Sequence, residues 1–125
     1  MHSPEFAAKV AFIGTLNFPF ESIFKAYYTR ATLYDAMAIA AAIKLFENKN
    51  GNAPNNLQEL VPGYLPEVYS DPFNDFKPLK YEKSNKGWVV YSFGPDRKDD
   101  GAQKLYKFDD KDKKDETGDI VFSSE

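Results

Sequence analysis

Carboxylates are the side chains of this sequence that could do chemistry, and many of them gather in one stretch. Between residues 94 and 119 the chain reads GPDRKDDGAQKLYKFDDKDKKDETGD, with acids at Asp96, Asp99, Asp100, Asp109, Asp110, Asp112, Asp115, Glu116 and Asp119. Paired carboxylates can act as general acid and base when their environments differ. Basic residues are interleaved throughout, however, so we interpret residues 111–116 as a solvated face.

The rest of the composition excludes several functional classes. The chain has no Cys, and its single His is His2. Disulfide scaffolds, thiolate zinc sites, thiol nucleophiles and a Ser-His-Asp triad therefore have no candidate residues. A pI near 5.2 and a formal charge of −3 argue against nucleic-acid binding. We therefore expect a protein that is not an enzyme.

Length and apolar content predict one domain over residues 1–125. Of the 125 residues, 42% are hydrophobic, which is enough for a core without disulfides. No apolar stretch reaches the roughly 18 residues of a membrane span. One interpretation of the opening MHSPEF is a vector remnant, in which case the natural protein continues upstream with an export signal or a membrane anchor. We divide the chain into an N-terminal segment (1–18), a long helix (19–50) and a loop-rich region with a sheet (51–125).

Two helices are expected in the first half of the chain. Ser3 can cap a short helix that runs to about Ile13. A long helix over about residues 20–48 follows, and it stops at an Asn-rich stretch before Gly51. This second helix is expected to be the dominant element of the domain.

The long helix is apolar on two faces. At 100° per residue one stripe comprises Ile23, Tyr27, Tyr34, Met37, Ala38, Ala41 and Leu45, and the other comprises Phe24, Tyr28, Ile39, Ile43 and Phe46. We assign the first stripe to the core, so Met37→Asp should cost several kcal/mol. The second stripe should be covered by the first helix or by a neighbouring molecule.

Short elements rich in turn residues follow the helix. Asn55 or Asn56 is expected to cap a helical turn that ends at Leu60. Strands are expected at residues 79–83, 88–93 and 119–123, with residues 105–108 as an edge strand. Asn85 and Gly87 suit a tight hairpin between the first two strands. The predicted fold class is α+β: a long helix packed on an antiparallel sheet of three or four strands.

The order of these features resembles the pseudopilins of type II secretion, and most closely the globular part of the major pseudopilin. The likeness covers about residues 29–122. It rests on the helix end at Asn50-Gly51, Pro54, LQELVPGYL at 57–65, SDPFN at 70–74, Tyr81, YSFGPD at 91–96 and GDI at 118–120. The resemblance implies a pilin-like head in the periplasm or cell envelope, anchored in the membrane in the full-length protein.

The family pattern also implies a calcium loop after the second strand. In that family backbone carbonyls and Asp side chains bind the ion, and a hard cation prefers six to eight oxygen ligands. The ligands carried over to this sequence are the Phe93 carbonyl, Asp96 and Asp119, with Asp99 or Asp100 as the local candidate for a further carboxylate. The alternative is a solvated turn in which Asp96 caps backbone N–H groups.

Three other residues are expected to have structural roles. Asp71 precedes Pro72, which restricts it to extended conformations, so we interpret its carboxylate as a turn device that accepts local N–H groups. Trp88 and Tyr91 are expected to pack in the sheet.

Two functions remain open on the sequence. The first is a non-enzymatic structural subunit that self-associates, or joins other pseudopilin-like subunits, through the long helix in a periplasmic filament for protein export. The second is an envelope binding module of the same fold that docks a partner and does not polymerise. The given sequence lacks the basic leader, the processed Gly and the apolar segment of a pseudopilin, so the upstream reading frame separates the two hypotheses.

Overall fold

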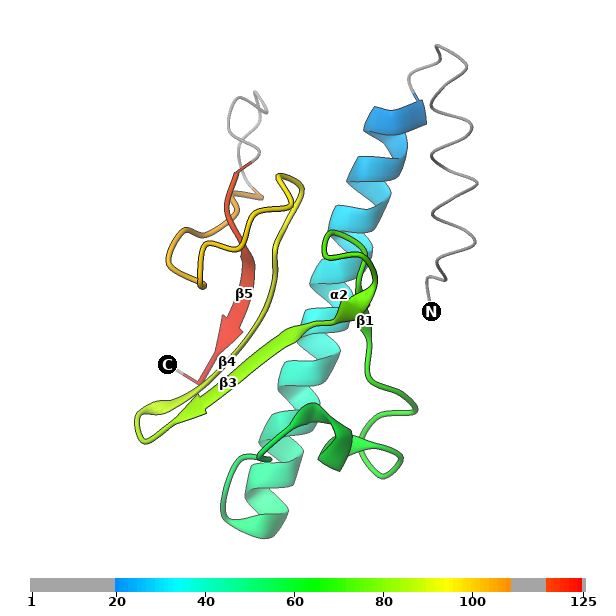
Figure 1. Cartoon of the computed structure of the whole chain (residues 1–125). Coiled ribbons are helices and arrows are strands. Elements are labelled where there is room, and N and C mark those ends of the chain that lie inside the picture. The colour runs from blue at the N-terminus through cyan, green and yellow to red at the C-terminus, as the bar shows by residue number, and fades with distance from the viewer. Residues whose placement is uncertain (1–19, 109–116, 125) are drawn as a thin grey trace.

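A long helix and two small antiparallel sheets make up the part of the chain that the structure describes (Figure 1). The structure, a computed structural model, describes residues 20–108 and 117–124. The elements are α2 (Phe20–Asn50), the 3-10 helix η1 (Leu57–Leu60), β1 (Ser70–Asp71), β2 (Lys77–Pro78), β3 (Lys80–Ser84), β4 (Gly87–Ser92) and β5 (Ile120–Ser123). The predicted α+β class is confirmed. The expected first helix and the run 111–116 lie outside the described residues.

Helix α2 continues for 31 residues because its sequence contains no Gly or Pro and seven alanines. Glu21 in the first turn and Lys49 in the last turn complement the helix dipole. The helix ends at Gly51, whose positive φ of 84° suits the left-handed position after a helix and whose N–H donates to the Glu47 carbonyl. The predicted helix of about 20–48 is thereby confirmed. Within the described residues no helix combines the length and the apolar character that crossing a membrane requires.

The helix buries the opposite face from the one predicted. Ile39 and Ile43 are fully buried, whereas Tyr34 is 64% and Met37 46% exposed. The exposed large apolar side chains of α2 are Ile23, Tyr27, Tyr34, Met37 and Leu45, so the assignment of this stripe to the core was wrong. The predicted loss of several kcal/mol for Met37→Asp is therefore also wrong, because a charged side chain at an exposed position stays hydrated.

The residues that lie between the apolar ones explain why α2 buries the second stripe and exposes the first. Arg30 and Lys44 lie along the exposed stripe, and burying either charge without a partner would be costly. The buried face carries Ala36 and Ala42 instead, which let the strands approach the helix closely. The second stripe is covered, and its cover among the described residues includes β4 and β5.

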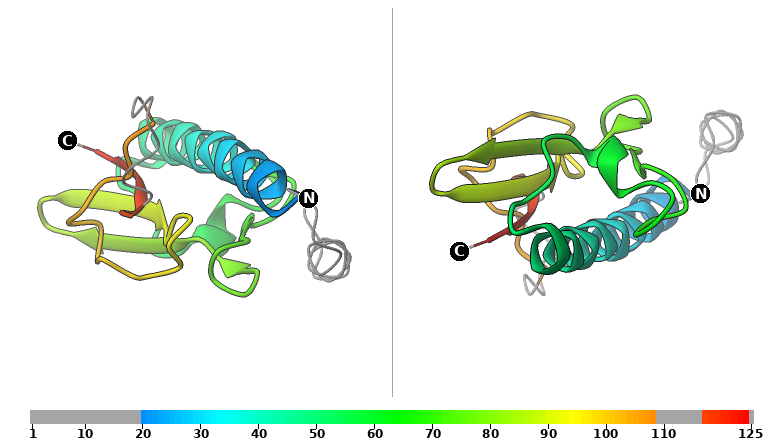
Figure 2. Two further views of the ribbon diagram at one scale, coloured as in Figure 1. Left: turned by 90° about the horizontal axis from the view of Figure 1, so that it is seen from above. Right: turned by 90° about the horizontal axis from the view of Figure 1, so that it is seen from below.

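The main sheet has the strand order β3-β4-β5, and both pairs are antiparallel. A two-residue turn of Asn85 and Lys86 joins β3 to β4, which confirms the predicted hairpin. The predicted edge strand at 105–108 was wrong, since Leu105 makes only a single parallel bridge to Asp119. Figure 2 shows the sheet and the loops together on one side of α2. The small hairpin of β1 and β2 was not predicted, because two-residue strands have no periodicity to detect.

The core has two apolar clusters along α2. The larger joins Ile39 and Ile43 to η1 and the sheet, and the smaller contains Tyr28, Phe73 and Ile120. Trp88 is 5% exposed and its ring nitrogen donates to Glu47 Oε1 at 2.6 Å, so its predicted packing role in the sheet is confirmed.

The cap of η1 also follows the prediction. Asn56 Oδ1 accepts the N–H of Glu59 at 3.2 Å, and Glu59 Oε2 accepts the N–H of Asn55 at 2.6 Å. This reciprocal pair satisfies two backbone donors at the start of the turn and positions the apolar Leu57 and Leu60 toward the core.

A polar patch on the buried face of α2 interrupts the apolar packing. Thr32 and Asp35 are almost fully buried, and neither Thr32 Oγ1 nor Asp35 Oδ2 has a hydrogen-bond partner among the described residues. Burial, with a smaller contribution from the nearby Glu67, raises the pKa of the Asp35 carboxyl to about 7. Below about pH 7 the folded protein therefore favours the neutral form of Asp35.

The two faces of α2 can be compared directly by truncation. We expect Ile39→Ala to lower the free energy of unfolding by about 3 kcal/mol through lost burial and the cavity that it leaves. Met37→Ala, on the exposed face, should change it by no more than about 0.5 kcal/mol. Urea unfolding of both variants measures the difference. Equal losses would mean that the two faces are buried alike.

The unusual carboxyl in the core predicts a pH dependence. Because the pKa of Asp35 is raised to about 7 in the folded state, its contribution to stability is complete below pH 4 and is lost as the pH rises to about 7. Asp35→Asn should therefore be more stable than the parent by about 1 to 2 kcal/mol at pH 8, with the difference in stability shrinking toward pH 4. Asp75→Asn, at an exposed turn, is the control. A pH-independent difference in unfolding midpoint between Asp35→Asn and the parent would contradict the assignment.

Candidate functional site

The loop after β4 starts from a fixed point set by Asp71. This side chain is fully buried at the end of β1. Its Oδ1 accepts the N–H of Phe73 at 3.0 Å and the hydroxyl of Ser92 at 2.7 Å, and its Oδ2 accepts the N–H of Phe93 at 2.9 Å. Burial raises the pKa of Asp71, while these three bonds lower it. The predicted turn role is confirmed, and the same carboxylate also holds the end of β4.

Two glycines let three chain segments cross just beyond this point. Gly94 has φ 76° and Gly118 has φ 106°, conformations that L side chains rarely adopt. A Cβ on Gly94 would collide with the Gly118 carbonyl oxygen, and a Cβ on Gly118 would lie 2.7 Å from the backbone nitrogen of Tyr106. The segments at 94, 105–106 and 118–119 therefore lie in direct backbone contact.

Asp119 is the centre of this crossing. Its backbone N–H donates to the Lys104 carbonyl at 2.7 Å, and its carbonyl accepts the N–H of Tyr106 at 2.8 Å. Its buried carboxylate accepts the N–H of Asp100 at 3.2 Å and the N–H of Ala102 at 2.9 Å. Asp119 thus holds the 100–106 segment against the start of β5.

Asp96 and Asp99 also accept backbone donors. Asp96 Oδ1 accepts the N–H of Lys98 at 3.0 Å, and its Oδ2 accepts the N–H of Gly118 at 3.3 Å. These contacts match the alternative interpretation, in which Asp96 caps backbone N–H groups. Asp99 Oδ1 accepts the N–H of Gly101 at 2.8 Å and the hydroxyl of Tyr91 at 3.1 Å.

The loop holds the like-charged carboxylates of Asp99, Asp100 and Asp119 close together. The pKa of Asp119 is raised to about 6: burial is the main cause, the two backbone N–H groups oppose it, and the carboxylates of Asp100 and Asp99 add to the rise. Asp100 Oδ2 is buried and has no hydrogen-bond partner among the described residues. Burial and the bond to Asp99 also raise the pKa of Tyr91. Carboxylates that repel one another therefore lie close together around Asp100 and Asp119.

The structure brings together most of the predicted ligand set. Asp99, Asp100 and Asp119 interact electrostatically, and Asp96 reaches the same crossing through Gly118. Phe93 is held by its N–H at the start of the loop, and the role of its carbonyl stays a prediction. Across residues 20–108 and 117–124, no three or more acidic or His side chains are arranged as a metal-binding group. Backbone carbonyls would have to supply the remaining ligands.

Sequence reasoning missed three contacts of this site. It did not find the reach of Asp71 to Ser92, the contact of Tyr91 with Asp99, or the N–H of Ala102 at Asp119. Gly94 and Gly118 were the available signal, because Gly is favoured where backbones approach closely.

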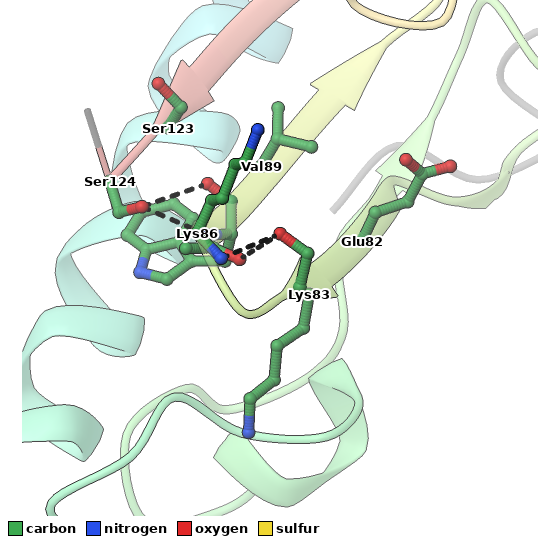
Figure 3. A pocket seen from close by; sticks show the side chains of 9 residues that line it. Glu82, Lys83, Lys86, Val89, Ser123 and Ser124 are labelled. Carbon is green, nitrogen blue, oxygen red and sulfur yellow. Dashed lines mark hydrogen bonds between the residues drawn. The ribbon is translucent and has the colours of Figure 1, made fainter.

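A hollow of about 330 Å³ lies at the far end of the sheet, beside the turn of the β3–β4 hairpin (Figure 3). Lys83, Lys86 and Glu82 lie around it. Its hydroxyls serve the local backbone: Ser124 Oγ accepts the N–H of Trp88 at 3.0 Å, and Ser84 Oγ accepts the N–H of Lys86 at 3.2 Å. We therefore interpret this hollow as a structural feature of the β3–β4 hairpin and not as a binding site.

No protein-family model, curated protein or solved structure matches this chain. The resemblance to pseudopilins therefore stays a prediction that rests on the motifs and on the geometry described above.

The anchoring role of Asp71 can be measured. Asp71→Asn keeps the shape of the side chain, but its amide NH₂ group cannot accept a hydrogen bond, so at least one of the three donors loses its acceptor. We expect a loss of about 2 kcal/mol in the free energy of unfolding. Ser92→Ala, which removes one of the three bonds, should cost about 1 kcal/mol. Urea unfolding gives both values. Losses under about 0.5 kcal/mol for Asp71→Asn would show that the carboxylate is not an anchor.

Proposed function

We propose that this protein is a non-enzymatic structural subunit: the head of a pseudopilin-like protein that assembles through α2 in a periplasmic filament for protein export. The observation that carries the proposal is the exposed apolar face of α2. Helix α2 packs against the sheet on one side and leaves Ile23, Tyr34, Met37 and Leu45 exposed on the other. Exposed apolar residues gathered along one helix face are typical of an interaction surface.

The fold supports this role in a second way. A helix of 31 residues is about 46 Å long, so it extends well beyond the sheet that covers one of its faces. Two acidic side chains of the head have structural partners: Asp71 accepts the Ser92 hydroxyl, and Glu47 accepts the Trp88 ring N–H. In this proposal the function of the head is to present the exposed apolar face of α2 to other subunits.

Calcium at the loop after β4 forms part of the proposal. The buried Asp100 Oδ2 and the raised pKa of Asp119 are the observations that fit a cation, because a positive ion would offset the repulsion between these carboxylates. Asp99 and Asp96 lie in the same loop and would complete the carboxylate set after giving up N–H partners. Calcium would supply charge balance and order there.

Export in the source organism tests the proposed function. Disrupting the gene should leave secreted proteins in the periplasm, and the full-length parent gene should restore their release. Met37→Glu should fail to restore it although the head stays folded, because a charge replaces an exposed apolar contact. Lys86→Glu, at the exposed turn of the β3–β4 hairpin, is the control and should restore release. Export that is unchanged by the disruption would refute the role.

Thermal melting tests the calcium proposal separately. Free calcium at about 100 times its dissociation constant should add about 2.7 kcal/mol of stability. Asp100→Asn should abolish that gain and should itself be stabilising without calcium, because it removes one of the repelling charges. Asp75→Asn, at an exposed turn outside the loop, should leave the gain intact. A melting temperature of the parent that neither calcium nor chelator moves would exclude the ion.

A further inference from the structure

A cleft of about 470 Å³ lies between the first turns of α2 and the loop after β4. Figure 1 shows these two segments at the same end of the molecule. On the helix, Lys25 and Thr29 are four residues apart, as are Ala26 and Arg30, and this spacing places them along one side of α2. Thr29 is buried and its hydroxyl donates to the Lys25 carbonyl at 2.7 Å, so it forms part of the floor. The volume is that of a small-molecule site.

The opposite side of the cleft is apolar. It consists of Pro95, which is buried, and the half-buried Tyr106 and Phe108. The N–H of Tyr106 donates to the Asp119 carbonyl at 2.8 Å, so the crossing of chain segments at Asp119 holds this side in place. The two rings meet edge to face, with centroids 4.8 Å apart and planes at 77°. Such a pair forms a corner and not a flat platform, which suits a flexible aliphatic chain better than a planar base.

The charged groups of the cleft suit a head group with one negative charge. Among the described residues that line it, Lys25 and Arg30 are basic and Glu21 is acidic, which leaves a net charge of +1. The chain as a whole carries −3, so the cleft is basic on an otherwise acidic protein. A carboxylate or a phosphodiester balances this charge, whereas a polyphosphate would exceed it.

We infer that this cleft binds an anionic amphiphile. The head group lies between Lys25 and Arg30, and the aliphatic chain packs against Tyr106 and Phe108. A fatty acid and an anionic phospholipid share this chemistry. The inference goes beyond the proposed function and does not depend on it, because the four exposed apolar residues on which that proposal rests do not line the cleft.

Octanoate is the soluble probe, and the NMR shifts of backbone amides in the whole chain locate where it binds. We expect a dissociation constant of about 1 mM, which is ordinary for a ligand of this size, with the largest shifts at the cleft. Octanamide has the same chain without the charge, and inorganic phosphate has a charge without the chain. Each should bind at least about fivefold more weakly than octanoate. Equal binding of octanoate and either of these compounds would overturn the inference.

Substitutions on exposed positions of α2 test the cleft without altering the core. Arg30→Gln should weaken octanoate binding about three- to fivefold, the loss expected for one partly exposed ion pair. Ala26→Glu adds an acid to the lining and should weaken binding about tenfold. Lys44→Gln and Ala41→Glu make the same changes at exposed positions that do not line the cleft, so they should leave binding unchanged. Equal losses in each variant and its control would show that octanoate does not bind in the cleft.

Vesicle flotation separates the two sources of the amphiphile. Flotation with vesicles of phosphatidylglycerol and phosphatidylcholine, but not of phosphatidylcholine alone, would assign the cleft to a phospholipid if Ala26→Glu abolishes it. Octanoate binding without flotation would assign the cleft to a free fatty acid. No shift at the cleft with about 10 mM octanoate, together with no flotation that Ala26→Glu abolishes, would overturn the inference and leave the proposed filament role standing.

Discussion

The packing of Ile39 and Ile43 against the sheet is the interaction on which the rest of the structure depends. Both side chains are fully buried, together with Val90 of β4 and Leu60 of η1. Because they fix which side of α2 faces the sheet, they also fix which side faces solvent. The packing of β4 and β5 on α2 and the exposure of the opposite apolar face follow from that choice of face.

The elements were largely predictable, and the choice between the two helix faces was not. An uninterrupted run without Gly or Pro determined α2, and turn residues between β-prone runs determined the β3–β4 hairpin. The two stripes of α2 have comparable apolar content, so periodicity alone could not rank them. Arg30 and Lys44 within one stripe, and Ala36 and Ala42 within the other, carry the information that separates them.

The candidate site was predictable in its residues but not in its contacts. Asp96 and Asp119 were named from the resemblance to pseudopilins, and Asp99 and Asp100 as nearby carboxylates that could add oxygen ligands. Their partners are mostly backbone N–H groups, which every residue except proline carries, so no residue type reveals them. The bonds that Asp119 accepts from Asp100 and Ala102 arise only when chain segments far apart in sequence cross.

The contact of Trp88 with Glu47 gives the domain a built-in optical reporter. Trp88 is the single tryptophan of the chain, its indole lies in the core, and its ring nitrogen donates to a carboxylate on α2 while Lys44 Nζ lies 6.0 Å from the ring centroid. Its emission colour and quenching therefore respond to the separation of the helix from the sheet. Opening of that layer, whether by denaturant, by a partner or by an ion at the far loop, becomes visible as fluorescence without any label.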